Sequence, residues 1–159
     1  MFMPWKTTLK RAEKDKREGK SPTTQAGEFV REEMEHIRRG KHGARSAKQA
    51  IAIGLSKARR AGVDLQPPKK GTTSEATRRK AEQDLERAHS GKAAKPSRKR
   101  SQAREKALKK EPRSAASHAA LSKQAKTAAA ARKRRAPTTP GAGKKTSRGR
   151  KNAAAGRKR

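Results

Sequence analysis

Apolar and polar residues alternate with a helical period mainly between residues 24 and 63. In the segment TQAGEFVREEMEHIRR, the apolar side chains fall on one helical face: Ala26, Phe29, Val30, Met34 and Ile37. Acidic residues gather toward its start, two arginines occupy its last turn, and Gly40 follows. These features suit the helix dipole and a glycine stop. The pattern predicts a helix over residues 24–39.

A second amphipathic segment, RSAKQAIAIGLSKARRAGV, comes directly after it. Ser46 and Gln49 match the S-x-x-Q capping box, and Gly62 followed by Val63 is typical of a helix end. We therefore expect a helix over residues 46–61. Small residues recur at every fourth position of this helix, where they would let another helix approach closely: Ala50, Gly54 and Ala58.

The two helices are expected to form a hairpin across the short turn 40–45. The candidate core has eight side chains: Phe29, Val30, Met34, Ile37, Ile51, Leu55, Val63 and Leu65. Such a small core is marginal, so we expect stabilisation from a homodimer contact through the hairpin or from binding.

Two side chains of the hairpin, Glu33 and Ile53, do not fit its main apolar faces. Glu33 lies near the apolar face of its helix and could pair with a basic residue of the second one. Ile53 projects toward Gln49, Lys57 and Arg60. It belongs either to a wide core face or to a second contact surface for another chain or a ligand.

The rest of the chain divides by composition. Pro67 and Pro68 interrupt the pattern, and a third, mostly polar helix is expected near residues 73–90, with a thin apolar face. An Ala-rich stretch over 114–135 has high helix propensity and could form a transient helix. The expected fold class is mainly α. The expected parts are a basic N-terminal arm (1–22), a hairpin (23–66), a linker with the polar helix (67–91) and a low-complexity cationic tail (92–159). Outside the three helices, the chain is expected to be disordered or to form Ala-rich transient helix.

Charge is the strongest compositional signal. The 159 residues carry a net charge of +32, with 29% hydrophobic and 38% charged residues. Residues 92–159 hold 24 basic and two acidic residues, so most of the excess lies there. So much self-repulsion is explained by a polyanionic partner. Duplex DNA is favoured over RNA, because single strands are usually bound by stacking aromatic residues, which are nearly absent here.

The motif RSAKQAIAIGLSKARRAGV (45–63) resembles a family of short, basic, uncharacterised bacterial proteins. Their shared core reads Lys-Gln-Ala-Ile-Ala-Ile-(Gly/Ala)-Leu-Ser-x-Ala-Arg, and a helix like the one ending in MEHIRRGKH usually precedes it. The resemblance covers roughly residues 24–65 and implies DNA binding. The tail is similar, in composition alone, to the Lys/Ala-rich arms of linker-histone-like bacterial proteins.

Phosphate contacts by the tail would drive binding through counterion release. About ten simultaneous contacts would give a salt slope of log K near −9. The basic face of the second hairpin helix could also enter a major groove, or touch only phosphates. Arg-Gly-Arg in SRGRKN forms the centre of an AT-hook, although the usual following proline is a lysine. The expected DNA-binding residues are Arg45, Lys48, Lys57, Arg59, Arg60, Arg98, Lys99, Arg100, Arg132, Lys133, Arg134, Arg135, Arg148, Arg150 and Lys151.

Catalytic chemistry is not indicated. Cysteine is absent. The pairs Glu32/His36 and Glu86/His89 have metal-site spacing, but we expect both on solvated helix faces, without a converging ligand set. GAGKKT departs from the phosphate-loop pattern. We therefore expect no metal, cofactor or small-molecule substrate, and no enzymatic activity.

The expected function is that of a nucleoid-associated, histone-like DNA-binding protein in the cytoplasm, without a membrane span. Two alternatives remain. One is an RNA- or ribosome-associated basic protein. The other is a dimerisation or docking module that its tail tethers to nucleic acid.

Overall fold

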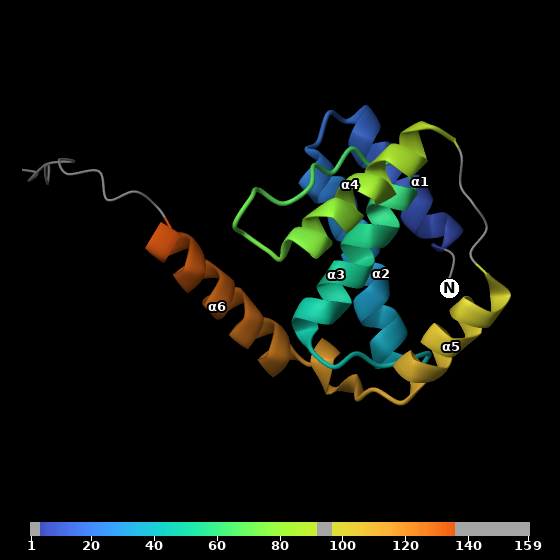
Figure 1. Ribbon diagram of the computed structural model, residues 1–159, viewed down its shortest axis with the longest axis vertical. Helices are drawn as coiled ribbons and strands as arrows, with labels where there is room; N and C mark the ends of the chain where they lie inside the picture. Colours follow the sequence, from blue (N-terminus) through green and yellow to red (C-terminus); the bar gives the residue numbers. More distant parts are fainter. Residues whose placement is uncertain (1–3, 92–96, 136–159) are drawn as a thin grey trace, which may run out of the picture.

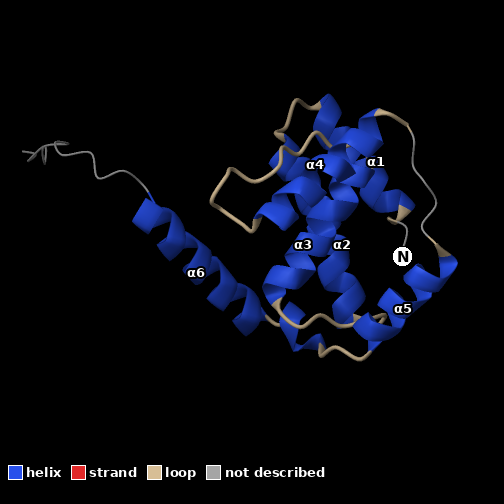
Figure 2. Cartoon of the chain, viewed as in Figure 1, coloured by secondary structure: helices blue, strands red, loops and turns tan. Residues whose placement is uncertain are grey.

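The computed structural model describes residues 4–91 and 97–135, and this part of the chain contains helices and turns but no strand (Figure 1, Figure 2). The elements are α1 (Lys6–Arg17), α2 (Pro22–Arg38), α3 (Ala47–Arg60), α4 (Glu75–His89), α5 (Arg98–Lys109), the short 3-10 helix η1 (Arg113–Ala116) and α6 (His118–Arg135). The predicted mainly α fold class is confirmed.

The hairpin of α2 and α3 forms the centre of the fold (Figure 1). Both helices, and α4 after them, begin and end within two residues of the predicted positions. The small residues of α3 allow the expected close approach of α2. A Cβ atom added at Gly54 would lie 2.7 Å from Cα of Val30. The two backbones can approach this closely only because that side chain is absent.

The predicted helix ends are also present. Oγ of Ser46 accepts a hydrogen bond from the backbone N–H of Gln49 at 3.2 Å, while the Gln49 side chain accepts from the N–H of Arg45 at 2.9 Å. Gly40 adopts a φ of 72°, a left-handed conformation that glycine tolerates, and the following N–H of Lys41 bonds to the carbonyl of His36. This turn sends the chain back over the end of α2.

The core has two apolar clusters, and all eight predicted core residues belong to them or pack against them. One cluster surrounds Phe29, with Val63 and Leu65 from the segment after α3. The other surrounds Met34 and Ile37. α4 covers α3 through Ala81, its only buried apolar residue, which agrees with the thin apolar face expected for it.

The prediction of a basic arm over residues 1–22 is wrong for its described part, because Lys6–Arg17 forms α1 and packs on α2. Its buried residues, Thr8, Ala12 and Asp15, recur at helical spacing. Only Ala12 among them is apolar, and Leu9 is the one further apolar side chain that joins the core. With so few apolar positions, the sequence of α1 looks like that of a solvent-exposed segment, so its packing on α2 could not be predicted.

The predicted cationic tail from residue 92 is more ordered than expected: the helix expected in the Ala-rich stretch 114–135 corresponds to α6, whereas α5 and η1 were not predicted. The N–H groups of Gly43 and Ala44 donate to the carbonyls of Leu108 and Pro112, at 2.9 and 3.0 Å. Ala115 and Ala116 of η1 are buried in the second cluster. Leu121 packs against this cluster, and α6 extends away from the other helices (Figure 1). Residues 108–121 therefore belong to the folded body.

Gly43→Ala should detach this C-terminal segment. The added Cβ would lie 1.8 Å from the carbonyl oxygen of Glu111, so the backbone of residues 108–112 must move. Two hydrogen bonds, at about 1 kcal/mol each, would be lost. Hydrogen–deuterium exchange should show faster exchange over residues 108–121, with Gly27→Ala as the control because nothing lies within 4 Å of Gly27. Unchanged protection of the segment would contradict this packing.

Candidate functional site

A group of ionisable side chains is buried beside the second half of α2. It consists of Glu32, Glu33, His36, His42 and Lys57, which we call the buried cluster. Their exposed fractions are 2%, 0%, 1%, 3% and 5% respectively. Burying a charge or an imidazole is costly unless it is paired, so a fold this small must compensate each of these groups.

Short contacts link the groups of the buried cluster. Nζ of Lys57 donates to Oε2 of Glu33 at 2.5 Å, which confirms the expected pairing of Glu33 with the second hairpin helix. Nε2 of His42 lies 3.2 Å from the other oxygen of Glu33, Oε1. Nε2 of His36 lies 3.6 Å from Oε1 of Glu32. Glu33 therefore joins α2, α3 and the turn after α2.

Local structure explains this arrangement. Glu32 and Glu33 lie four and three residues before His36 on α2, so each of them is a neighbour of His36 on the helix surface. The left-handed turn at Gly40 carries His42 back onto that face. The Nδ1 atom of His42 is 3.0 Å from the carbonyl oxygen of Gly43, which orients the ring.

Trp5 covers the buried cluster from the start of α1. Its backbone N–H donates to Oε2 of Glu32 at 3.1 Å, and its ring meets His36 edge to face, with centroids 4.7 Å apart. The cationic groups of Arg39 and Lys41 lie 5.1 and 4.9 Å from the centroid of the Trp5 ring. The half-buried indole thus separates the cluster from two surface cations.

His36 is neutral at physiological pH. Burial, and then the positive charges of Lys57 and Lys41, lowers the pKa of its imidazole to about 4. A neutral imidazole in a buried site is a potential metal ligand.

The expectation of solvated faces is wrong for Glu32 and His36, which are both buried. The expected lack of convergence is wrong too, since Glu33, His36 and His42 each offer one donor atom within 4.8 Å of the others. Counting helix spacing found the pair Glu32/His36 but not the i, i+3 pair Glu33/His36. His42 lies beyond the helix end, so only the geometry of the Gly40 turn brings it in.

Two of the expected DNA-binding residues of α3 are not on the surface. The Nζ of Lys57 is bonded to Glu33. Arg59 is 6% exposed, and its Nε donates to the carbonyl of Leu65 at 3.0 Å. Arg60 is half-buried and donates to the carbonyl of Ser56. The expectation that Lys57 and Arg59 project toward a phosphate backbone is therefore wrong. Arg45 and Lys48 are exposed.

The two C-terminal helices carry many exposed cations, as does α1, whose six basic residues are all exposed. The expected residues of α5 are all exposed, as are those described near the end of α6: Arg98, Lys99, Arg100, Arg132, Lys133 and Arg134. Arg135 is the last residue of α6. The AT-hook-like positions Arg148, Arg150 and Lys151 lie outside the described residues.

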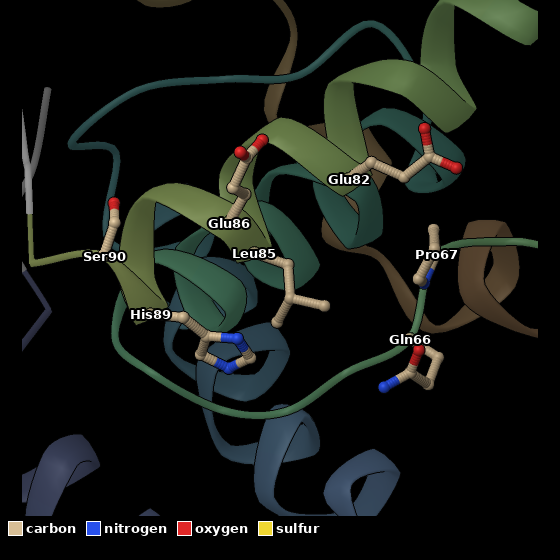
Figure 3. A pocket seen from close by; sticks show the side chains of 7 residues that line it. All are labelled: Gln66, Pro67, Glu82, Leu85, Glu86, His89 and Ser90. Atoms are coloured by element: carbon tan, nitrogen blue, oxygen red, sulfur yellow. The ribbon is translucent and has the colours of Figure 1, made fainter.

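A shallow depression lies between α4 and the segment at Gln66 and Pro67, and its side chains are drawn in Figure 3. Leu85 and His89 point into it, whereas Glu86 points away. The depression is open to solvent and brings no converging catalytic set together. Glu86 and His89 are both exposed, as expected. Among the described helices, none is both long and apolar enough to cross a membrane.

Comparison with known proteins gives one match. Residues 16–70 match the model of a family of unknown function, DUF6496. No curated protein and no solved structure is significantly similar to the chain. The matched segment contains α2, α3 and every residue of the buried cluster. The chain is thus similar over about a third of its length to an uncharacterised family.

Proposed function

We propose that this protein is a non-enzymatic nucleic-acid-binding protein that holds duplex DNA through phosphate contacts, as a nucleoid-associated protein would. The observation that carries the proposal is the density of cations in the C-terminal part. Residues 97–135 contain fourteen basic and only two acidic residues. In α6 there are six basic residues and no acidic one. Such a surface displaces the counterions condensed on duplex DNA.

The arrangement of the helices supports a binding surface on the C-terminal helices rather than on the hairpin. The hairpin uses Lys57 and Arg59 for its own internal contacts. The exposed cations of α5 and α6 have few acidic neighbours, and α6 extends from the body where a long polyanion can reach it (Figure 1). The hairpin then serves as the scaffold, and the C-terminal helices supply the binding surface.

The aromatic residues favour duplex DNA over single strands. Proteins that bind single strands usually stack bases on exposed aromatic rings. Phe29 is only 1% exposed, and the Trp5 ring packs on His36 beneath two cations. Within the described residues, no aromatic side chain is left for stacking.

The test is the salt dependence of duplex DNA binding by the full chain. Replacing Arg132, Lys133 and Arg134 by Gln should reduce the steepness of log K against log salt by about 0.9 per lost phosphate contact, hence by nearly 3. Fluorescence anisotropy with a labelled duplex measures this slope. Structured RNA as a competitor shows whether the preference for duplex DNA holds.

The matched control removes the same charge from α4. Arg78, Arg79 and Lys80 are replaced by Gln, because their helix has as many acidic as basic residues, and Glu75 and Glu82 form ion pairs with Arg78. This variant should keep most of the slope. Equal losses in both variants would contradict a localised interface. Absence of measurable DNA binding at low salt would overturn the proposed function.

A further inference from the structure

The contact between His42 and Glu33 has an unusual electrostatic requirement. A carbonyl oxygen only accepts hydrogen bonds, so Nδ1 of His42 carries the proton in its 3.0 Å contact with the carbonyl of Gly43. In a neutral ring, Nε2 then has its lone pair directed outward. That atom is 3.2 Å from Oε1 of Glu33, which is also an acceptor. Two acceptors at this distance repel each other unless a proton or a metal ion lies between them.

His36 brings a third donor to the same place. One donor atom each from Glu33, His36 and His42 lies within 4.8 Å of the other two, and all three side chains are buried. Zinc binds imidazole nitrogen and carboxylate oxygen at about 2.0–2.2 Å, which places ligands of a tetrahedral ion about 3.3 Å apart. Small side-chain rotations of the three residues would therefore close a site around one ion. We propose that Glu33, His36 and His42 bind a Zn²⁺ ion.

The surroundings of these residues match the outer shell of a metal site. Metal-binding histidines usually donate their second ring N–H to a backbone carbonyl or a carboxylate, which fixes the ring orientation. His42 does this to Gly43. Glu32 places a carboxylate oxygen 3.6 Å from His36 and is itself held by the backbone N–H of Trp5. Lys57 holds Oε2 of Glu33, so Oε1 is the oxygen that faces the ion.

The donor set selects the class of metal. Two imidazoles and one carboxylate suit zinc and other late first-row divalent ions, whereas Mg²⁺ and Ca²⁺ prefer oxygen ligands alone. The site is enclosed by α2, the turn after it and Trp5, so the ion would have a structural purpose. It would fasten the turn at His42 to α2, and with it the loop against which residues 108–112 pack.

The test uses the tag-free, full-length protein after removal of metals with EDTA. Trp5 is the single tryptophan of the chain, and its ring touches His36, so its fluorescence reports on the site. Titration with Zn²⁺ should change this emission with a stoichiometry of one, and competition with a chromogenic chelator should give the affinity. Co²⁺ in place of zinc should quench Trp5 and show the intense visible bands of a four-coordinate site.

The variants assign the ligands. His42→Gln should weaken Zn²⁺ binding by about 100-fold or more, since even outer-shell changes cost 10–100-fold. The matched control is His89→Gln together with His118→Gln, because both histidines are exposed and far from the cluster in sequence. It should bind Zn²⁺ as the native chain does. If His42→Gln does not fold, the Co²⁺ spectrum and the Trp5 quenching of the native chain still test whether the metal site exists.

Three results would overturn the proposal. They are the absence of one-equivalent Zn²⁺ binding, an octahedral Co²⁺ spectrum, and equal weakening by the control variant. The first would mean that a direct contact, rather than a metal, joins His42 to Glu33. None of these results bears on the DNA measurements, which concern other residues.

Discussion

Replacing Gly54 by alanine is expected to lower the midpoint of thermal unfolding by about 10 °C. The added Cβ would lie 2.7 Å from Cα and 3.0 Å from the amide nitrogen of Val30, both backbone atoms of α2. Overpacking of a well-packed contact costs about 1–3 kcal/mol. About 2 kcal/mol corresponds to roughly 10 °C in a domain of this size.

The reason is that backbone cannot move aside as a flexible side chain can. The two central helices must separate, and their separation also determines whether Lys57, one turn further along α3, reaches Glu33. The loss should therefore exceed the gain of about 1 kcal/mol that alanine normally brings to a helix in place of glycine. Circular dichroism during heating measures the change.

Gly27→Ala is the matched control for this substitution. Gly27 also lies in a helix, but nothing is within 4 Å of a Cβ added there, so alanine should raise stability by up to about 1 kcal/mol. Opposite signs for the two variants are the expected result. A stabilised Gly54→Ala variant would mean that α2 and α3 are further apart than the structure shows.

The hairpin could be predicted because its signals are local. Phe29, Met34 and Ile37 recur at helical spacing, and Ser46 and Gly62 mark the ends of α3. The pairing of Glu33 with α3 could also be anticipated, since an acid beside an apolar face needs a partner from the facing helix. The partner itself, Lys57, was expected at the surface. Its long apolar stem lets it lie at the edge of a buried face with its charge turned inward.

The C-terminal packing could not be predicted, because alanine carries little information in an Ala-rich segment. Ala115 and Ala116 are buried, whereas Ala119 and Ala125 are exposed, and nothing local distinguishes them. Their burial depends on Gly43, whose missing side chain leaves room for the backbone at Glu111. A contact between residues about seventy positions apart leaves no periodic pattern.

The buried cluster was missed for a related reason. Spacing along one helix identifies pairs of residues, and a pair does not make a site. His42 joins only because Gly40 turns the chain, and Trp5 covers the cluster only because α1 is a helix. The one usable signal was Glu33 and His36 at i, i+3, followed by a histidine just after a helix-ending glycine.

Replacing Lys57 by methionine is expected to destabilise the metal-free protein by about 3–5 kcal/mol. The Lys57 and Glu33 side chains are 5% and 0% exposed. Removing one partner of a buried pair leaves the other charge uncompensated, and that cost exceeds the net gain from the pair itself. Urea denaturation in the presence of EDTA measures the loss.

The control is Glu35→Gln on the same helix. Glu35 pairs with Arg39 at 3.3 Å, but the Arg39 side chain is 63% exposed, so this change should cost less than about 0.5 kcal/mol. Glu33→Gln, with the same change of atoms, should cost several times more because it leaves the ammonium group of Lys57 buried without its counter-charge.

The double variant Glu33→Gln/Lys57→Met separates the strength of the pair from the penalty of breaking it. With both charges removed, no buried ion is left unpaired, so the double variant should be more stable than Lys57→Met alone. The coupling energy of the cycle should reach about 2–3 kcal/mol. Additive losses in the cycle, or a Lys57→Met variant within 1 kcal/mol of the native protein, would contradict the contact. The two charges would then be solvated separately, and Glu33 would not be the residue that joins α2, α3 and the turn at His42.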